Sequence, residues 1–155
     1  MKIFIADESY GDFEKVATLF FEYYSYLDNC GVPFKLIDGG EELWMNSLKK
    51  SLNKTSVLVV LENKGLVNGF GHGQLKLSPD YLGNLRMGVV SHFYVDEKLR
   101  GGDAAKKMFE EMKKWFEEKK VSSIELQVVN ENKVGSRFWK KMGFTTELEQ
   151  MRLRF

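Results

Sequence analysis

The sequence has a single cysteine, so it can form no disulfide within the chain and can supply no thiolate cluster for zinc. Lys and Arg number 23 and Asp and Glu number 22, for a formal charge of +1. This balance provides no basic field for a nucleic-acid backbone. The apolar runs are shorter than a signal peptide or a membrane span requires. We therefore expect a soluble cytoplasmic protein without a metal, a nucleic-acid partner or a membrane partner.

The one cysteine, Cys30, stands in the stretch DNCGVPF, which has the composition of a turn. We expect a spectator thiol there rather than a nucleophile. With 155 residues, 43% hydrophobic and 14% aromatic content, the chain can bury one sizeable core. No internal repeat, low-complexity tract or linker interrupts it. The sequence therefore predicts one domain over residues 1–155.

Hydrophobic periodicity predicts an alternation of strands and helices along the chain. The expected elements are a strand at 2–6, a helix at 13–27 with Asp12 as N-cap, a helix at 41–52, a hairpin within 56–77 that turns at 63–65, a strand at 86–95, a helix at 104–116, a strand at 123–129, a helix at 132–142 and two strands within 143–155. The order β-α-α-β-β-β-α-β-α-β-β indicates a mixed α/β domain. Because a helix separates the strands at 86–95 and 123–129, we expect these two strands to pair in parallel.

Two glycines stand at the start of the helix at 104–116, in the stretch DEKLRGGDAAKKMF. A helix N-terminus presents unpaired N–H groups and partial positive charge, and Gly101 and Gly102 let the backbone fold closely around an anion. Arg100 adds a fixed cation. Neither Gly-x-x-x-x-Gly-Lys-Ser/Thr nor Gly-x-Gly-x-x-Gly is present, which disfavours nucleoside triphosphate hydrolysis and dinucleotide binding. Taken alone, these glycines are equally compatible with a simple turn into a helix capped by Asp103.

Two motifs in the right order settle that choice, because the sequence resembles the GNAT superfamily of acyl-CoA-dependent N-acyltransferases. FYVDEKLRGGDAAKKMFEEM fits the family's Arg/Gln-x-x-Gly-x-Gly/Ala loop, with Arg100 in its first position and Ala105 in its last. NKVGSRFWKKMGF fits a second family motif through residues at matching spacing: Asn132, Gly135, Trp139, Gly143 and Phe144. The resemblance covers residues 56–155 clearly and the first 55 residues by element order.

The resemblance implies a single-domain fold with a central, mixed and largely antiparallel twisted sheet of six or seven strands and about four helices on its faces. It also implies acetyl-CoA as cofactor, with coenzyme A as product. The pyrophosphate would bind on the loop backbone, the thioester carbonyl on the strand backbone before it, the pantetheine arm at Asn132 and the sulfur end near the aromatic pair. The cofactor residues so implied are Phe93, Tyr94, Val95, Arg100, Gly101, Gly102, Asp103, Ala104, Ala105, Lys106, Asn132, Phe138 and Trp139.

The sequence departs from the family pattern at two positions. Asp103 replaces the middle glycine of the loop motif, where an inward carboxylate would repel pyrophosphate and an outward one would cost little. Trp139 replaces the tyrosine that usually protonates the leaving thiolate. Indole donates a hydrogen bond but has no usable acid at neutral pH. The thiolate would then leave unassisted or through water, or catalysis would be weak.

Acid–base candidates lie on two neighbouring strands. The resemblance places an acid–base group a few residues before the strand's cofactor-binding end, where VVSHFYV offers Ser91 and His92, with the Phe93 backbone beside them as a catalytic donor. His92 could accept the amine proton directly or through water, unless strand alternation turns it to the other face. His72 is a second candidate, and Glu125 is a weaker one.

The resemblance implies an acceptor site formed by the first two helices and the loop between them, with contacts from Tyr23, Tyr24, Phe34 and His72. Acidic side chains there would attract a cationic amine: Glu22, Asp28 or Asp38. The sequence favours an N-acetyltransferase that moves acetyl to a primary amine of a small molecule or peptide by direct transfer in a ternary complex. The alternatives are a non-catalytic acyl-CoA-binding or protein-interaction module, and an enzyme for longer acyl chains. The terminal strand EQMRLRF could also pair or pack across a subunit boundary in a homodimer, which the sequence does not decide.

Overall fold

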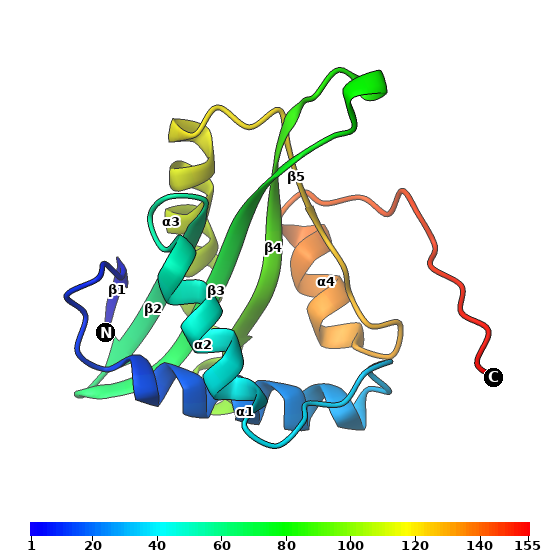
Figure 1. Ribbon diagram of the computed structural model, residues 1–155. Coiled ribbons are helices and arrows are strands. Elements are labelled where there is room, and N and C mark those ends of the chain that lie inside the picture. The colour runs from blue at the N-terminus through cyan, green and yellow to red at the C-terminus, as the bar shows by residue number, and fades with distance from the viewer.

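A computed structural model describes the whole chain, residues 1–155 (Figure 1). Its elements, in chain order, are β1 (Lys2–Ile5), α1 (Phe13–Asn29), α2 (Gly40–Ser51), β2 (Ser56–Asn63), β3 (Leu66–Leu77), β4 (Arg86–Val95), α3 (Ala104–Glu118), β5 (Ser123–Leu126) and α4 (Lys133–Lys141). Short 3-10 turns at Asp80–Leu82 and Glu97–Leu99 precede and follow β4. The helices and the strands up to residue 126 match the sequence-based expectation closely. None of the helices is long and apolar enough to cross a lipid bilayer.

The five strands form one sheet in the order β1-β2-β3-β4-β5. Neighbouring strands are antiparallel except β4 and β5, which pair in parallel. Helix α3 supplies the crossover between those two strands, which confirms the predicted parallel pair. Side chains therefore alternate between two faces of one sheet.

Each face of the sheet carries two helices and its own apolar core. Figure 1 shows α1 and α2 in front of the sheet and α3 behind it. The core under α1 and α2 includes Phe20, Leu48 and Phe70, while the other core lies under α3 and α4. In α3, apolar residues three and four positions apart form the buried stripe that the sequence predicts: Met108, Phe109, Met112, Trp115 and Phe116.

Strand β4 is paired along its whole length on one side only. Its pairing with β5 runs from Met87↔Ser123 to Val90↔Leu126 and then stops. On the β3 side, pairing continues to Gly69↔Val95, interrupted by a bulge that leaves Ser91 as the extra residue. The last residues of β4 therefore have a free backbone edge where β5 diverges.

The expectation of two terminal strands is wrong. The sheet has five strands rather than six or seven, and residues 143–155 form no strand. Their apolar and polar residues do alternate as in a strand, but a strand also needs a neighbouring backbone with which to pair. No such backbone lies beside this segment, which runs away from the body of the molecule in Figure 1.

Asp12 is the N-cap residue of α1, as the sequence predicts, but its carboxylate makes no capping hydrogen bond. It lies 3.0 Å from the Lys15 ammonium instead. The backbone carbonyl of Asp12 accepts the first amides of the helix. The position was therefore predicted correctly, and the side chain has a different role.

Candidate active site

The N-terminus of α3 presents a run of unpaired backbone donors. Gly101 has a φ of +82°, a left-handed conformation that glycine adopts at little cost. The first bond of the helix runs from the Lys107 N–H to the Asp103 carbonyl at 2.9 Å. The N–H groups of residues 101–106 thus have no acceptor within the protein. Together with the helix dipole, unpaired donors of this kind can bind an anion such as pyrophosphate.

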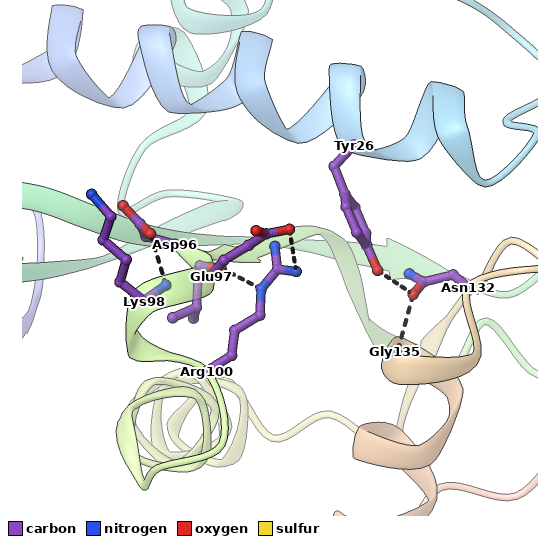
Figure 2. Close-up of polar contacts among 8 residues, drawn as sticks. Tyr26, Asp96, Glu97, Lys98, Arg100, Asn132 and Gly135 are labelled. Atoms are coloured by element: carbon purple, nitrogen blue, oxygen red, sulfur yellow. Dashed lines mark hydrogen bonds and ion pairs between the residues drawn. The ribbon is translucent and has the colours of Figure 1, made fainter.

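The two charged residues of this loop are arranged in different ways. Asp103 is exposed and accepts no capping hydrogen bond, so its carboxylate does not occupy the loop amides. The Arg100 side chain is held in place: Nε donates to the Val95 carbonyl at 2.8 Å, and the guanidinium lies 4.7 Å from the ring centre of Tyr26. It also pairs with Glu97 at 3.5 Å (Figure 2). A fixed cation therefore stands beside the loop donors.

The free edge of β4 continues from this loop. The Asp96 N–H donates to the Asn68 carbonyl of β3 at 2.8 Å, so by strand alternation Tyr94 and His92 also direct their backbone groups toward β3. The N–H groups of Phe93 and Val95 point the other way, toward the gap in pairing that follows Val90. These two donors, one strand period apart, can bind a carbonyl group laid along β4.

A hydrogen bond joins α1 to α4 next to that edge. The Tyr26 hydroxyl donates to Oδ1 of Asn132 at 2.9 Å, and the same oxygen accepts the Gly135 N–H at 3.0 Å, which caps α4. In Figure 2, Tyr26 reaches down from α1 to the start of α4, while Arg100 comes from the loop that precedes α3. Three elements thus converge here: α1, α4 and the loop before α3.

A buried polar cluster lies on the α1 and α2 face of the sheet. His72 and His92 are direct cross-strand partners, and their Nδ1 atoms are 3.1 Å apart. The indole N–H of Trp44 lies 3.2 Å from Nδ1 of His72, and the Gln74 carboxamide lies 3.2 Å from Nε2 of His72. The rings of Tyr23 and Tyr24 flank His92. The structure thus turns His92 toward the first two helices.

The donor in Trp44 determines the tautomers of both histidines. Indole only donates, so Nδ1 of His72 carries a lone pair and the proton of the neutral ring sits on Nε2. The Gln74 amide nitrogen lies 3.2 Å from Nε2, so the carboxamide must turn its oxygen inward to accept this proton. Nδ1 of His92 must then be the N–H donor to His72, which leaves the lone pair of His92 on Nε2. Nε2 of His92 has no hydrogen-bond partner within the protein.

Burial keeps both imidazoles neutral. Loss of hydration lowers the pKa of His72 to about 4. Loss of hydration and then the neighbouring His72 lower the pKa of His92 to about 3. Burial also raises the pKa of Tyr23 and Tyr24, which stay as neutral phenols. At neutral pH the cluster therefore presents an uncharged acceptor, Nε2 of His92.

The other predicted site residues lie at varying distances from this cluster. Phe34 is 65% exposed in the loop between α1 and α2, under the Arg152 guanidinium rather than beside the histidines. Glu125 pairs with Lys76 at 3.2 Å on the exposed side of the sheet. Trp139 is buried in the other core, where it contacts Phe93 and Phe138. The structure thus brings Tyr23, Tyr24, His72 and His92 together and leaves Phe34 and Glu125 apart.

Three residues of the site were not singled out from the sequence. Trp44 and Gln74 complete the histidine cluster, and Tyr26 bonds Asn132. Gln74 lies two residues after His72 on one strand, so its position on the same face was readable from strand alternation. Nothing local indicates that Trp44 or Tyr26 meets partners 28 and 106 residues away.

The site thus combines unpaired donors at the start of α3 with a free backbone edge along β4. Comparison with protein families agrees: the chain belongs to the acetyltransferase (GNAT) family, whose model matches residues 16–144. Acetyl-CoA is the acyl donor of this family and hence the cofactor of this acyltransferase. No group of three or more His, Cys, Asp or Glu residues forms a metal cluster.

Solved structures share the fold at low sequence identity. A tetramutant of the BH1408 protein from Bacillus halodurans matches with a TM-score of 0.81, 20% identity and 100% coverage of both chains. A predicted acetyltransferase from Clostridium acetobutylicum, solved with acetyl-CoA, matches with a TM-score of 0.77 and 21% identity, and the match covers 99% of this chain and 95% of that chain. Aminoglycoside N-acetyltransferase AAC(6')-Iy in complex with CoA matches with a TM-score of 0.79 and 12% identity, and the match covers 99% of this chain and 93% of that chain. No curated protein matches.

Proposed function

We propose that this protein is an N-acetyltransferase that transfers acetyl directly to a primary amine in a ternary complex. Bound acetyl-CoA supplies a thioester acyl group, whose carbon forms a bond with the amine nitrogen while the C–S bond breaks and coenzyme A leaves. The observation that carries the proposal is the presence of two sets of unpaired backbone donors, one at Phe93 and Val95 and one at residues 101–106. Donors placed in advance stabilise both a bound pyrophosphate and a developing oxyanion.

The cofactor-binding roles follow from where each group lies. Arg100 and the amides of Gly101, Gly102, Asp103, Ala104, Ala105 and Lys106 bind the pyrophosphate. The N–H groups of Phe93 and Val95, with the Tyr94 peptide between them, bind the acyl carbonyl. Asn132 binds the pantetheine arm, and Phe138 and Trp139 pack near the sulfur end. Because Trp139 supplies no acid, the proton for the departing sulfur comes through water.

His92 orients the amine and receives its proton transiently. Its unpaired Nε2 accepts an N–H hydrogen bond from the incoming neutral amine and so aligns the amine lone pair with the acyl carbon. A base with a pKa of about 3 does not retain a proton at pH 7, so the proton moves on to water. Trp44 and His72 act as positioning residues, since they hold His92 in this tautomer. Ser91, at the bulge, lies next to His92 in the strand.

The acceptor approaches from the α1 and α2 face, where Tyr23, Tyr24 and His72 surround His92. Aromatic rings and neutral phenols favour an amine on an apolar or aromatic carrier, small molecule or peptide. Aminoglycosides are acceptors of one structural relative by its name, and they are one class to include among test acceptors. The second candidate function, a non-catalytic acyl-CoA-binding module, is favoured by one observation: Trp139 stands where a proton donor is usual.

Release of free coenzyme A, followed with a thiol reagent, separates the two functions. We expect amine-dependent release with at least one acceptor from a panel of polyamines, amino acids, aminoglycosides and peptides with free N-termini. The acetylated product should be detected by mass spectrometry in equal amount. Tight binding of acetyl-CoA without release above the hydrolysis control for any amine would support the non-catalytic module.

A further inference from the structure

Tyr26, in the last turn of α1, contacts two side chains that the proposed function assigns to the cofactor. Its hydroxyl donates to Oδ1 of Asn132 at 2.9 Å, and the Arg100 guanidinium lies 4.7 Å from its ring centre. In Figure 2 the Tyr26 ring lies between the Arg100 guanidinium and Asn132. Tyr26 belongs to neither of the two family motifs, yet it touches one residue of each.

The hydroxyl of Tyr26 helps to determine which atom of the Asn132 carboxamide is free to bind a ligand. A backbone N–H can only donate, so the carboxamide atom that lies 3.0 Å from the Gly135 nitrogen must be the oxygen. That oxygen also accepts the Tyr26 proton, while the amide nitrogen Nδ2 makes no hydrogen bond within the protein. Burial raises the pKa of Tyr26, so its hydroxyl keeps its proton and remains a donor at neutral pH. Asn132 therefore offers Nδ2, a donor that matches the amide carbonyls of a pantetheine arm.

The ring of Tyr26 confines the cation beside the α3 loop. The Arg100 guanidinium lies 4.7 Å from the ring centre of Tyr26 and 5.3 Å from that of Tyr94. Its Nε donates to the Val95 carbonyl, and its Nη1 lies 3.5 Å from the Glu97 carboxylate. Attraction to the faces of two aromatic rings stabilises this position of the guanidinium. Without the Tyr26 ring, only Tyr94 would supply such an attraction.

We propose that Tyr26 is a positioning residue for acetyl-CoA, which orients Asn132 through its hydroxyl and Arg100 through its ring. The inference rests on the proposed function, in which Asn132 binds the pantetheine arm and Arg100 binds the pyrophosphate. It adds a residue of the first helix to a cofactor site whose other residues all lie within 93–139. Because the hydroxyl and the ring act on different parts of the cofactor, their contributions can be measured separately.

Two substitutions at this position separate the two contacts. Tyr26→Phe removes the hydroxyl and keeps a ring beside Arg100, whereas Tyr26→Leu removes both. Isothermal titration calorimetry measures the affinity for acetyl-CoA and for 3′-phospho-ADP, which has the pyrophosphate but no pantetheine arm. We expect Tyr26→Phe to weaken acetyl-CoA about 5-fold, because the carboxamide is no longer held in its binding position, and to change 3′-phospho-ADP by less than about 2-fold. Tyr26→Leu should weaken both ligands, 3′-phospho-ADP by about 3-fold, because Arg100 loses one of its two rings.

Tyr10→Phe is the matched control. The Tyr10 hydroxyl donates to the Glu62 carboxylate at 3.1 Å, so this variant also removes one phenolic hydroxyl and one hydrogen bond. Tyr10 precedes α1, whereas Tyr26 lies in the last turn of that helix. Tyr10→Phe should keep the wild-type affinity for both ligands. Equal losses of acetyl-CoA affinity in Tyr10→Phe and Tyr26→Phe would reflect a general loss of stability and would overturn the proposal.

A double-mutant cycle tests whether Tyr26 acts through Asn132. Asn132→Ser retains a capping oxygen for α4 and removes the carboxamide. In that background, Tyr26→Phe should change the acetyl-CoA affinity by less than about 2-fold, because the group that the hydroxyl orients is absent. A further loss as large as in the wild-type background would show that Tyr26 acts independently of Asn132, contrary to the proposal.

Steady-state kinetics separates positioning from proton donation. In Tyr26→Phe, KM for acetyl-CoA should rise about 5-fold while kcat at saturating substrates is retained, since His92 and the β4 donors are unchanged. A fall in kcat with unchanged acetyl-CoA affinity would make the Tyr26 hydroxyl a proton donor and would overturn its positioning role. Wild-type protein that binds neither ligand would contradict the proposed function itself. Normal wild-type binding of acetyl-CoA that Tyr26→Phe leaves unaltered would contradict this inference alone.

Discussion

Replacement of Gly101 by valine is expected to weaken acetyl-CoA binding at least 100-fold. Gly101 has a φ of +82°, which a β-branched residue adopts only at a cost of about 1–3 kcal/mol. The loop relieves this strain by moving, and the N–H groups of residues 101–106 then no longer converge on one anion. Each hydrogen bond to a charged group contributes about 1.5–3 kcal/mol, so loss of two exceeds the stated factor. Isothermal titration calorimetry measures the dissociation constant.

Gly65→Val is the matched control. Gly65 has a φ of +76° in the turn between β2 and β3, and a side chain there, as at Gly101, meets no atom within 4 Å. The two variants thus share the same backbone strain, and only one lies in the proposed site. Gly65→Val should keep the wild-type affinity while losing similar thermal stability. Equal loss of affinity in both variants, or in neither, would rule out the pyrophosphate loop.

His92→Ala is expected to lower kcat/KM for the amine by about 100- to 1,000-fold with little change in acetyl-CoA affinity. A positioned proton acceptor usually contributes a factor of this size. The pH dependence distinguishes the role of His92 from that of an ordinary histidine base. Its folded pKa of about 3 lies below the usual value of about 6.5, so the imidazole stays neutral throughout pH 5–8. Wild-type kcat/KM should therefore rise with pH only as the amine deprotonates, with no inflection near 6.5.

Trp44→Phe tests the tautomer argument within the same experiment. Phenylalanine retains a ring that can stack on Phe20, whose centre lies 3.9 Å from that of Trp44, but it removes the N–H donor. His72 can then exchange tautomers, and kcat should fall about 10-fold while acetyl-CoA affinity is retained. An inflection near pH 6.5 in the wild type that disappears in His92→Ala would show that the histidine titrates normally and would contradict this mechanism.

Local features of the sequence predicted where the loop with unpaired amides lies. Glycines before an amphipathic helix lead directly to unpaired amides at Gly101 and Gly102, and Asn132 caps α4 with the side chain that its motif places there. The order of helices and strands up to residue 126 was also predictable, because apolar residues recur with a different period in helices and in strands. The Asp103 carboxylate is exposed and makes no capping hydrogen bond, and the low-cost alternative stays a prediction.

Contacts between distant segments could not be predicted in the same way. The role proposed for His92 depends on the β3–β4 register, which sets it opposite His72, and on α2, which brings Trp44 to the same point. Tyr26 contacts Asn132, which lies 106 residues away in the sequence. The prediction of two terminal strands was wrong for a related reason. Alternation of apolar and polar residues shows that a segment can form a strand, but whether it does depends on a pairing partner that the segment's own sequence does not reveal.

Thermal unfolding with and without acetyl-CoA tests the cofactor site most directly. Ligand at about 100 times its dissociation constant stabilises the folded state by about 2.7 kcal/mol, which raises Tm by about 5–10 °C for a domain of this size. We predict such a shift with acetyl-CoA and with coenzyme A, but not with adenosine, which lacks the pyrophosphate. An unchanged Tm at millimolar acetyl-CoA would contradict the assignment of the α3 N-terminus and the β4 edge as the cofactor site.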